Sequence, residues 1–464
     1  MQKLRGAHKP TNSHVEIGQQ VLLTIKRLGI NGEGVGYYKG QVVFVVGALP
    51  SEQVIVKIVD IEKNHAIGEI VHIKKPSAHR QKPSCPKADQ CGGCQLLHMS
   101  YAGQLQAKQQ LVIEAFQKYT KLKPVPVRDI VGMDRPWEYR NKAQYQVGLK
   151  DRKLVTGLYA PNSHDLVDLS QCPIQHPKVN QIIRVVSKVL HQLGITPYNS
   201  NRGTGVVRTL VVRVSFTRGE AQLTIVTGTK ELPRQAELIT KLREALPQLI
   251  GISQNINRDK TSVVFGSETR LLWGQDKIRE GLGAMEFSLS PRAFFQLNPQ
   301  QTQKLYHFVQ EAAAVTKQDT VVDAYCGVGT IALWLAREAK AVRGIEMVPE
   351  AVEDARENAQ QAGVDDATFV VGKAEEILPQ WVKEGFRPDV VTVDPPRSGL
   401  DYSLMDAIVR AKPKRLVYVS CNPATLAKNC DYLMHQGYEV KWIQPVDMFP
   451  HTAHVECIVK LERR

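Results

Sequence analysis

The chain has 464 residues, which at roughly 150 residues per domain corresponds to about three domains. Lysine and arginine number 60 and aspartate and glutamate 46, a net charge of +14, and 43% of residues are hydrophobic, a balance that excludes intrinsic disorder. Residues 1–150 hold 22 basic and 11 acidic side chains, so +11 of the surplus lies in the first third. This distribution predicts an N-terminal part that faces a polyanion.

No apolar run approaches the roughly 20 residues that a membrane helix needs, and no apolar stretch follows the charges at the start of the chain. We therefore expect a cytoplasmic protein with no membrane association, a monomer without an obligate protein partner. Eight cysteines are too few for a disulfide scaffold, yet Cys85, Cys91 and Cys94 lie close together. In a reducing compartment such crowding indicates metal binding or catalysis.

Short alternating runs at residues 20–25, 41–46 and 53–58, separated by glycine-rich turns, predict a small five-stranded β-barrel over residues 13–73. Basic residues flank it, namely Lys74, Lys75, Arg80, Lys82 and Lys87. They favour an RNA-binding barrel of the OB type, although small barrels also serve purely structural roles.

The rest of the chain changes character near residue 290. Residues 74–290 combine a helical stretch at 101–119 with strands, which predicts a central α+β domain. Residues 291–464 alternate apolar strands and helices, the pattern of a doubly wound, Rossmann-like parallel sheet.

A glycine turn, Asp323-Ala-Tyr-Cys-Gly-Val-Gly-Thr330, ends the first strand of that sheet and lets the backbone approach a ligand. Glu346, 19 positions after Gly327, ends the next strand, where a carboxylate can bind ribose hydroxyls. The turn alone fits either NAD or S-adenosylmethionine.

Two further strands end in reactive groups, in Asp394-Pro-Pro-Arg397 and in Ser420-Cys421-Asn-Pro423. Because both lie at carboxyl ends, we expect them near the cofactor, with Cys421 as a candidate thiolate nucleophile. Glu456, in His454-Val-Glu456 before the last strand, is a candidate general base. Taken singly, a buried cysteine is usually a small hydrophobic residue and a lone edge glutamate is usually solvated.

Together the motifs resemble those of the S-adenosylmethionine-dependent RNA (uracil-5-)-methyltransferases. The resemblance rests on five motifs in order, Phe294-Phe-Gln296-x-Asn298, Asp323-x-Tyr-Cys-Gly-x-Gly329, Asp394-Pro-Pro-Arg397, Ser420-Cys-Asn-Pro423 and His454-Val-Glu456. The barrel is similar to a TRAM domain, so the likeness covers nearly the whole chain. It departs from many members at Tyr325, where phenylalanine is expected, and at Thr330, where others carry asparagine.

The resemblance implies Cys421 as nucleophile and Glu456 as proton acceptor in methyl transfer from S-adenosylmethionine to C5 of a uridine in RNA. It also implies cofactor contacts for Gln296, Tyr325, Glu346 and Asp394, and a helix at 100–122 that packs on the catalytic domain. An RNA-binding module without catalysis, an NAD enzyme and an amine methyltransferase are the alternatives, but none of them needs both Cys421 and Glu456.

Cys172 adds a fourth thiol 78 positions after Cys94. The set Cys85, Cys91, Cys94 and Cys172 fits a [4Fe–4S] cluster or a structural zinc. The three-plus-one spacing, with Pro86 and Pro173 after two of the cysteines, favours iron–sulfur, and the resemblance strengthens this interpretation.

The barrel and the cysteine set resemble members that act on large-subunit ribosomal RNA, so we expect 23S rRNA as substrate, with tRNA as the alternative. The target base is expected to flip out of its stack, against an aromatic such as Phe294. Further phosphate contacts are expected from basic residues of the central region, namely Arg140, Lys142, Arg202, Arg208 and Arg213.

Overall fold

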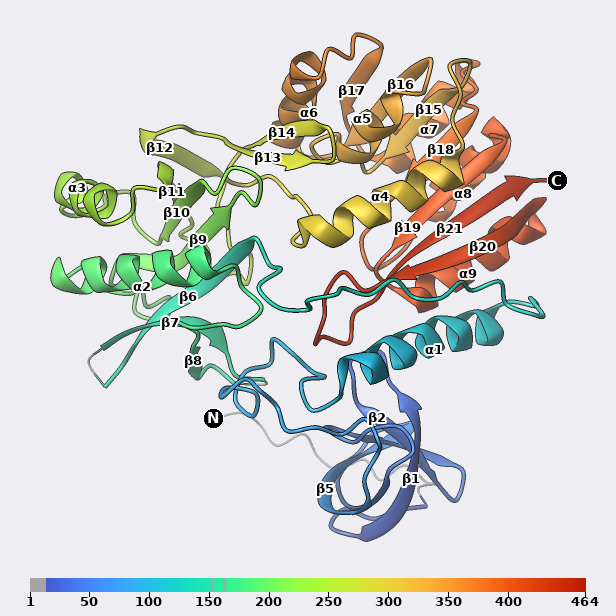
Figure 1. The fold of residues 1–464 in the computed structure, drawn as a ribbon, viewed down its shortest axis with the longest axis horizontal. Coiled ribbons are helices and arrows are strands. Elements are labelled where there is room, and N and C mark those ends of the chain that lie inside the picture. The colour runs from blue at the N-terminus through green and yellow to red at the C-terminus, as the bar shows by residue number, and fades with distance from the viewer. Residues whose placement is uncertain (1–13, 152, 162) are drawn as a thin grey trace.

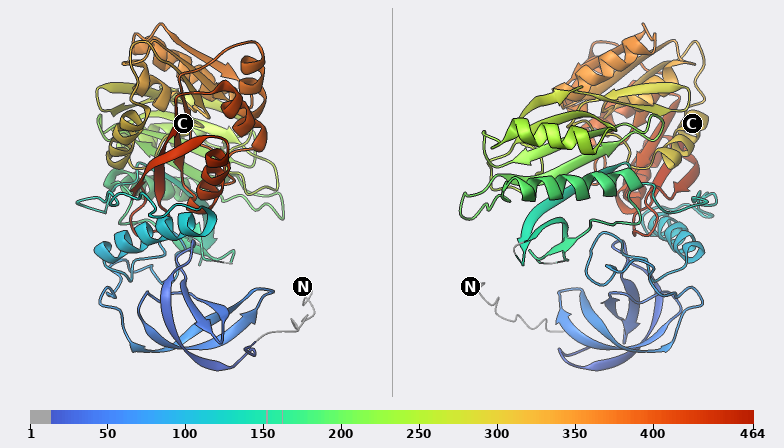
Figure 2. Two further views of the ribbon diagram at one scale, coloured as in Figure 1. Left: turned by 90° about the vertical axis from the view of Figure 1, so that its right-hand side faces the viewer. Right: turned by 60° about the vertical axis from the view of Figure 1, so that its left-hand side comes forward.

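The computed structural model describes residues 14–151, 153–161 and 163–464, so the barrel boundary expected at residue 13 lies outside the described residues. Figure 1 shows a barrel in the N-terminal part, a central sheet with helices, and a larger α/β domain in the C-terminal part. The barrel lies at one end of the molecule in each view (Figure 2). The predicted multidomain fold class is confirmed, with a barrel, an α+β region and a Rossmann-like domain.

Five strands form the N-terminal barrel. They are β1 (Gln20–Leu28), β2 (Gly34–Tyr38), β3 (Gln41–Val45), β4 (Gln53–Ile61) and β5 (His65–Lys75). The barrel closes in the order β1-β2-β3-β5-β4. Exposed and buried residues alternate along β1, so Val21, Leu23 and Ile25 enter the barrel core. This two-residue alternation is expected for a strand with one face buried in the core and the other exposed to solvent.

A seven-stranded sheet forms the central region. Its strands are β6 (Lys142–Lys150), β7 (Lys153–Tyr159), β8 (Leu166–Asp168), β9 (Val207–Val214), β10 (Ala221–Thr227), β11 (Leu249–Ile256) and β12 (Glu268–Gly274). They lie in the order β12-β11-β10-β9-β6-β7-β8. Helices α2 (Pro177–Gln192) and α3 (Gln235–Ala245) cover this sheet. In α2, Val179, Ile182 and Val186 recur at helical spacing and are buried.

The C-terminal domain is built on a second seven-stranded sheet. Its strands are β15 (Thr320–Ala324), β16 (Ala341–Glu346), β17 (Ala367–Val371), β18 (Val390–Val393), β19 (Arg415–Ser420), β20 (Tyr438–Val446) and β21 (Glu456–Arg463). The order is β17-β16-β15-β18-β19-β21-β20. The first five strands are parallel, but β21 inserts antiparallel beside β19. The sheet is therefore mixed, where the sequence predicted a parallel one.

Helices cover both faces of this sheet. They are α4 (Pro299–Ala313), α5 (Thr330–Ala336), α6 (Pro349–Gln361), α7 (Ala374–Lys383), α8 (Tyr402–Ala411) and α9 (Pro423–His435). One hydrophobic core contains α4, α5 and α6, and the other contains α7, α8 and α9. Among the described residues, no helix combines the length and apolar character that crossing a membrane would require.

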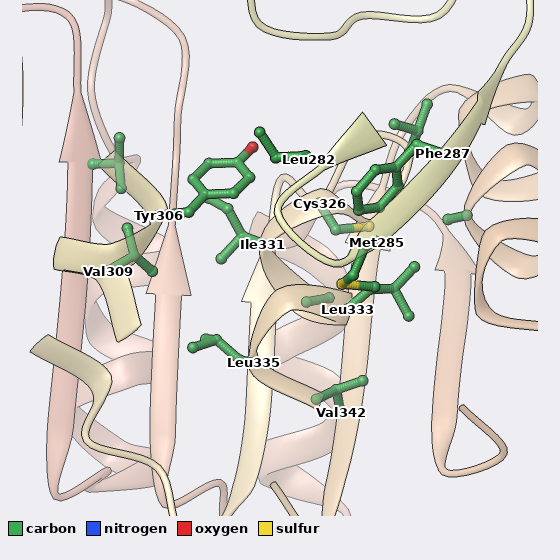
Figure 3. Packing of buried hydrophobic residues seen from close by; sticks show 14 of the residues in the cluster. Leu282, Met285, Phe287, Tyr306, Val309, Cys326, Ile331, Leu333, Leu335 and Val342 are labelled. Atoms are coloured by element: carbon green, nitrogen blue, oxygen red, sulfur yellow. The ribbon is translucent and has the colours of Figure 1, made fainter. Parts of the chain in front are cut away.

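Two segments before residue 291 pack against the C-terminal domain. The hairpin of β13 (Ile278–Leu282) and β14 (Met285–Leu289) buries Leu282, Met285 and Phe287 against α5 residues such as Leu333 (Figure 3). Helix α1 (Tyr101–Tyr119) packs Val112 and Phe116 into the opposite core, beside α9. Both segments thus pack against the cores of the C-terminal sheet, although they precede residue 291 in the chain.

Candidate active site

The carboxyl ends of the parallel strands gather the residues that the motifs singled out. Tyr325 follows β15, Glu346 ends β16, Asp394 follows β18 and Cys421 follows β19. These four strands are consecutive neighbours in the sheet. Their ends therefore form one edge, which is where open α/β sheets bind ligands.

The antiparallel strand β21 brings Glu456 to the same edge. Ser420 pairs with Cys457, so Cys421 and Glu456 are the next residues at that end of the β19–β21 ladder. The Glu456 carboxylate lies close enough to raise the pKa of the Cys421 thiol. The structure thus brings together a candidate nucleophile and a candidate base that are 35 positions apart in the chain.

The electrostatic surroundings of Cys421 work mostly against its ionisation. Burial raises the pKa of the thiol to about 11, helped by the carboxylates of Glu456 and Asp394, while the Arg397 guanidinium lowers it through charge and a hydrogen bond. The Asn422 amide donates to the Arg397 carbonyl at 3.0 Å, which ties the Asp394-Pro-Pro-Arg397 loop to the cysteine loop. Arg397 is therefore the cation that favours a thiolate here.

Two titratable groups beside Arg397 and Cys421, His454 and Glu456, have shifted pKa values. Burial and the nearby Arg397 charge lower the pKa of His454 to about 4, so its ring is neutral. The neutral Nδ1 of His454 lies 2.6 Å from an Arg397 nitrogen and accepts its hydrogen bond. Burial, together with Asp394, raises the pKa of Glu456 well above its usual range, which makes this carboxylate a stronger proton acceptor.

The sequence motifs contained Arg397 and His454, but sequence reasoning gave neither a role. Their adjacency arises where the Asp394-Pro-Pro-Arg397 loop meets the loop before β21, and no spacing along the chain indicates it.

The glycine turn has the backbone of a ligand cradle. Gly327 and Gly329 have φ of 55° and 83°, in the left-handed region that glycine adopts without strain. A Cβ at Gly327 would meet nothing within 4 Å, so the turn is open on that side. The Gly327 and Val348 amides donate to the two Glu346 oxygens at 3.2 and 2.9 Å, which places this carboxylate at the open turn.

The buried Asp323 carboxylate stabilises the glycine turn through hydrogen bonds. Its carboxylate accepts from the Thr392 hydroxyl and the Ala332 amide, both at 2.9 Å, and burial raises its pKa to about 7. Burial likewise raises the pKa of Asp394 to about 7. Open space, Glu346 and Asp394 at one edge fit an adenosyl cofactor with a cationic centre.

The segment that carries Gln296 is fastened to the central sheet. The Asn141 amide groups donate to the carbonyls of Gln296 and Leu297 at 3.2 and 2.9 Å. Gln296 is buried, whereas Phe294 is 65% exposed. These two hydrogen bonds connect the segment that carries Gln296 to Asn141, the residue directly before β6.

Several cations expected on the RNA surface are structural instead. Arg213 is buried and donates to the Ala293 carbonyl, and Lys142 is buried over the Phe265 ring. Arg208 donates to carbonyls of residues 257–261. The expectation of phosphate contacts was wrong for Arg213 and Lys142, because tertiary packing removes both side chains from the surface.

Cys421 opens into a cleft of about 750 Å³ between the barrel, α1 and the catalytic domain. The barrel contributes Arg27, Phe44 and His65 to its lining, and α1 contributes Lys118 and Tyr119. Basic and aromatic side chains thus line the same cleft as Cys421, together with Glu33 and Glu114.

The four cysteines predicted as ligands line one small cavity of about 20 Å³, although Cys172 is far from the others in sequence. Burial, together with the neighbouring thiols of Cys172, Cys91 and Cys85, raises the pKa of Cys94 to about 12. As the side chains stand, the described residues contain no group of three or more Cys, His, Asp or Glu that could hold a metal ion. Four convergent thiols nevertheless have the donor chemistry of a cluster or a zinc site.

The second sheet and its glycine turn define a Rossmann-like cofactor-binding domain, which an N-terminal barrel precedes in the chain. The sequence profile of the tRNA (uracil-5-)-methyltransferase family matches residues 100–464, and that of the TRAM domain matches residues 14–71. The chain therefore belongs to the tRNA (uracil-5-)-methyltransferase family and is an RNA methyltransferase that uses S-adenosylmethionine.

Full-length relatives agree with this assignment. An uncharacterized RNA methyltransferase of Bacillus cereus is 50% identical over 457 residues, 98% of this chain and 99% of its own. One of Listeria innocua is 47% identical over 453 residues, 97% and 99% of the two chains. The crystal structure of Pyrococcus abyssi tRNA (uracil-54, C5)-methyltransferase with S-adenosyl-L-homocysteine matches with a TM-score of 0.75 and 28% identity, covering 94% of this chain and 98% of that one.

Proposed function

We propose that this protein methylates C5 of a uridine in RNA through a covalent bond between the Cys421 sulfur and C6 of the uracil. One observation carries the proposal. The β19–β21 register places Cys421 beside Glu456, at the edge that also carries the glycine turn. A nucleophile and a base at one cofactor edge are what this reaction needs.

The residues around the turn fit S-adenosylmethionine. Bound there, S-adenosylmethionine supplies the electrophilic methyl group that an activated C5 takes up. We assign the ribose to Glu346 and further contacts with the cofactor to Gln296, Tyr325 and Asp394. The open space above Gly327 and the position of Glu346 support this assignment.

The side chains at this edge of the sheet have separate roles in the proposed reaction. C5 of uracil is a poor nucleophile, so the Cys421 thiolate first adds to C6 and pushes electron density onto C5 and the neighbouring carbonyl. Arg397 favours the thiolate and is held in place by His454. Once C5 is methylated, Glu456 accepts the C5 proton, the C6–S bond breaks and the 5,6 double bond is restored.

For the cysteine set we propose a [4Fe–4S] cluster bound by Cys85, Cys91, Cys94 and Cys172, with zinc as the alternative. The convergence of the four thiols on one cavity supports a shared metal group. We give it a structural role, because carbon methylation through an enolate needs no redox step. Iron and sulfide analysis of protein purified without oxygen distinguishes the two metals, since zinc without iron excludes the cluster.

For the substrate we propose 23S rRNA, in the cytoplasm. The barrel and α1 enclose a cleft that suits an unpaired strand, which supports a looped RNA target. A second candidate is tRNA, favoured by the full-length likeness to an archaeal tRNA (uracil-54, C5)-methyltransferase.

The deciding experiment uses RNA carrying tritium at C5 of uridine. Methylation by this mechanism releases one tritium for each methyl group transferred, whereas methylation at nitrogen or ribose releases none. Purified 23S rRNA and tRNA are compared as substrates under the same conditions. Methyl transfer without tritium release refutes the chemistry, and release with tRNA alone refutes the choice of 23S rRNA.

A further inference from the structure

The loop between β20 and β21 is held in part by residues that precede it in the chain by 311 to 358 positions. This β20–β21 loop (residues 447–455) begins after Val446 and ends before Glu456, and these two residues pair in register. Ala453 and His454 of the loop line the cleft beside Cys421. The conformation of the loop therefore bears directly on where the Glu456 carboxylate lies.

His451, in the middle of this loop, has an unfavourable backbone conformation. Its φ is 69°, in the left-handed region, which is unfavourable for a residue with a side chain. Its ring is buried and stacks on Trp137, with centroids 3.9 Å apart and planes 27° apart. Such a conformation persists only where the surrounding contacts hold it.

Gln104 of α1 supplies the closest of these contacts. Its Oε1 accepts the His451 backbone amide at 2.9 Å, and its Nε2 lies 3.2 Å from the His451 ring nitrogen Nδ1. The same Nε2 donates to the carbonyls of Leu96 and Met99 at 3.1 and 2.8 Å. Gln104 is fully buried, so water cannot replace these bonds when the side chain is removed.

The segment directly after Cys94 completes the contact. The Leu96 amide donates to the His451 carbonyl at 2.9 Å, and Gln95 Oε1 accepts the Ala453 amide at 3.3 Å. The Tyr139 hydroxyl donates to the Pro450 carbonyl at 3.1 Å. The segment after Cys94 and helix α1 thus form hydrogen bonds with backbone groups of the β20–β21 loop.

We propose that Gln104 is a positioning residue for proton removal at C5. By fixing the amide and ring of His451, it holds the β20–β21 loop where Glu456 reaches the C5 proton. This inference rests on the proposed function, because it assumes the roles given there to Cys421 and Glu456. Because Gln104 contacts the loop at His451 and not at His454, which holds Arg397, we expect its loss to slow proton removal more than addition of Cys421, so the covalent RNA complex accumulates.

The test is Gln104→Leu, which keeps the volume and removes every hydrogen bond. We expect kcat to fall about 10- to 100-fold, as for a base displaced by about 1 Å. The KM for S-adenosylmethionine stays within about twofold, and the fraction of RNA in an SDS-stable adduct rises. Gln106→Leu, an exposed glutamine on the same helix, is the matched control and leaves both unchanged.

A second pair of variants covers the case in which Gln104→Leu fails to fold. His451→Gly and His451→Ala remove the same ring, but only glycine adopts φ near 69° without strain. We expect more adduct with alanine than with glycine.

Glu456→Gln is measured alongside these variants. If it traps RNA, but the two His451 variants form equal amounts of adduct, or Gln104→Leu forms no more than Gln106→Leu, the role of Gln104 is refuted and the proposed function stands. If Glu456→Gln traps none, the proposed role of Glu456 fails and the inference falls with it.

Discussion

Lys108 and Asp447 form an ion pair that is almost completely removed from water, and its removal is a measurable test of the fold. Their side chains are 1% and 0% exposed, and Nζ lies 2.6 Å from Oδ1. The ammonium also donates to the Phe449 carbonyl at 3.1 Å, and the Tyr101 hydroxyl donates to Asp447 at 2.9 Å. The pair therefore joins α1 to the start of the β20–β21 loop.

Lys108→Met removes the charge and keeps most of the volume. It leaves the Asp447 carboxylate buried with one neutral donor from Tyr101, a defect that costs about 3–5 kcal/mol in comparable buried pairs. At about 2–4 °C per kcal/mol for a domain of this size, the melting transition of the catalytic domain falls by about 6–20 °C.

The assay is urea denaturation followed by tryptophan fluorescence, with Lys108→Met, Asp447→Asn and the double variant compared in one cycle. The double variant removes the unpaired charge and keeps an acceptor for Tyr101, so we expect it to be more stable than Lys108→Met. A loss below about 1 kcal/mol in Lys108→Met, or a double variant that is additive, would refute the reasoning, because the pair would then behave as a solvent-exposed one.

Further outcomes are expected for the candidate site and the cysteine set. Cys421→Ala abolishes methyl transfer, whereas Glu456→Gln lowers turnover and accumulates an SDS-stable RNA adduct; a Cys421→Ala variant that still methylates would contradict the mechanism. With a Cys421 pKa of about 11, only about one thiol in a thousand is ionised at pH 8, so the single-turnover rate rises up to about tenfold per pH unit towards pH 11. Arg397→Gln removes the group that lowers this pKa, so the rise moves to higher pH; an unmoved profile would exclude Arg397 from thiolate stabilisation. Glu346→Ala raises the KM for S-adenosylmethionine about 10- to 100-fold, since bonds to a carboxylate contribute about 1.5–3 kcal/mol, and titration calorimetry checks this against an unchanged affinity for RNA. Cys94→Ser lowers the iron content of protein purified without oxygen, and full iron occupancy in that variant would remove Cys94 from the ligand set.

The amino-acid pattern alone determined much of this protein. The alternating runs of the barrel, the strand–helix alternation after residue 291 and the glycine turn at Gly327 are local features, because periodicity and turn chemistry act over a few residues. Cys421 and Asp394 were also found this way, since each directly follows a buried strand and such ends converge in a parallel sheet.

Only the tertiary structure decided the rest, because strand order and the burial of cations depend on contacts between residues far apart in the chain. The antiparallel insertion of β21 beside β19 sets Glu456 next to Cys421, and nothing in the local sequence indicates that order. Arg213 was predicted on the RNA surface but lies beneath the segment that carries Gln296. The grip of Gln104 on His451 likewise exists only once α1 packs on the catalytic domain, since the two residues are 347 positions apart.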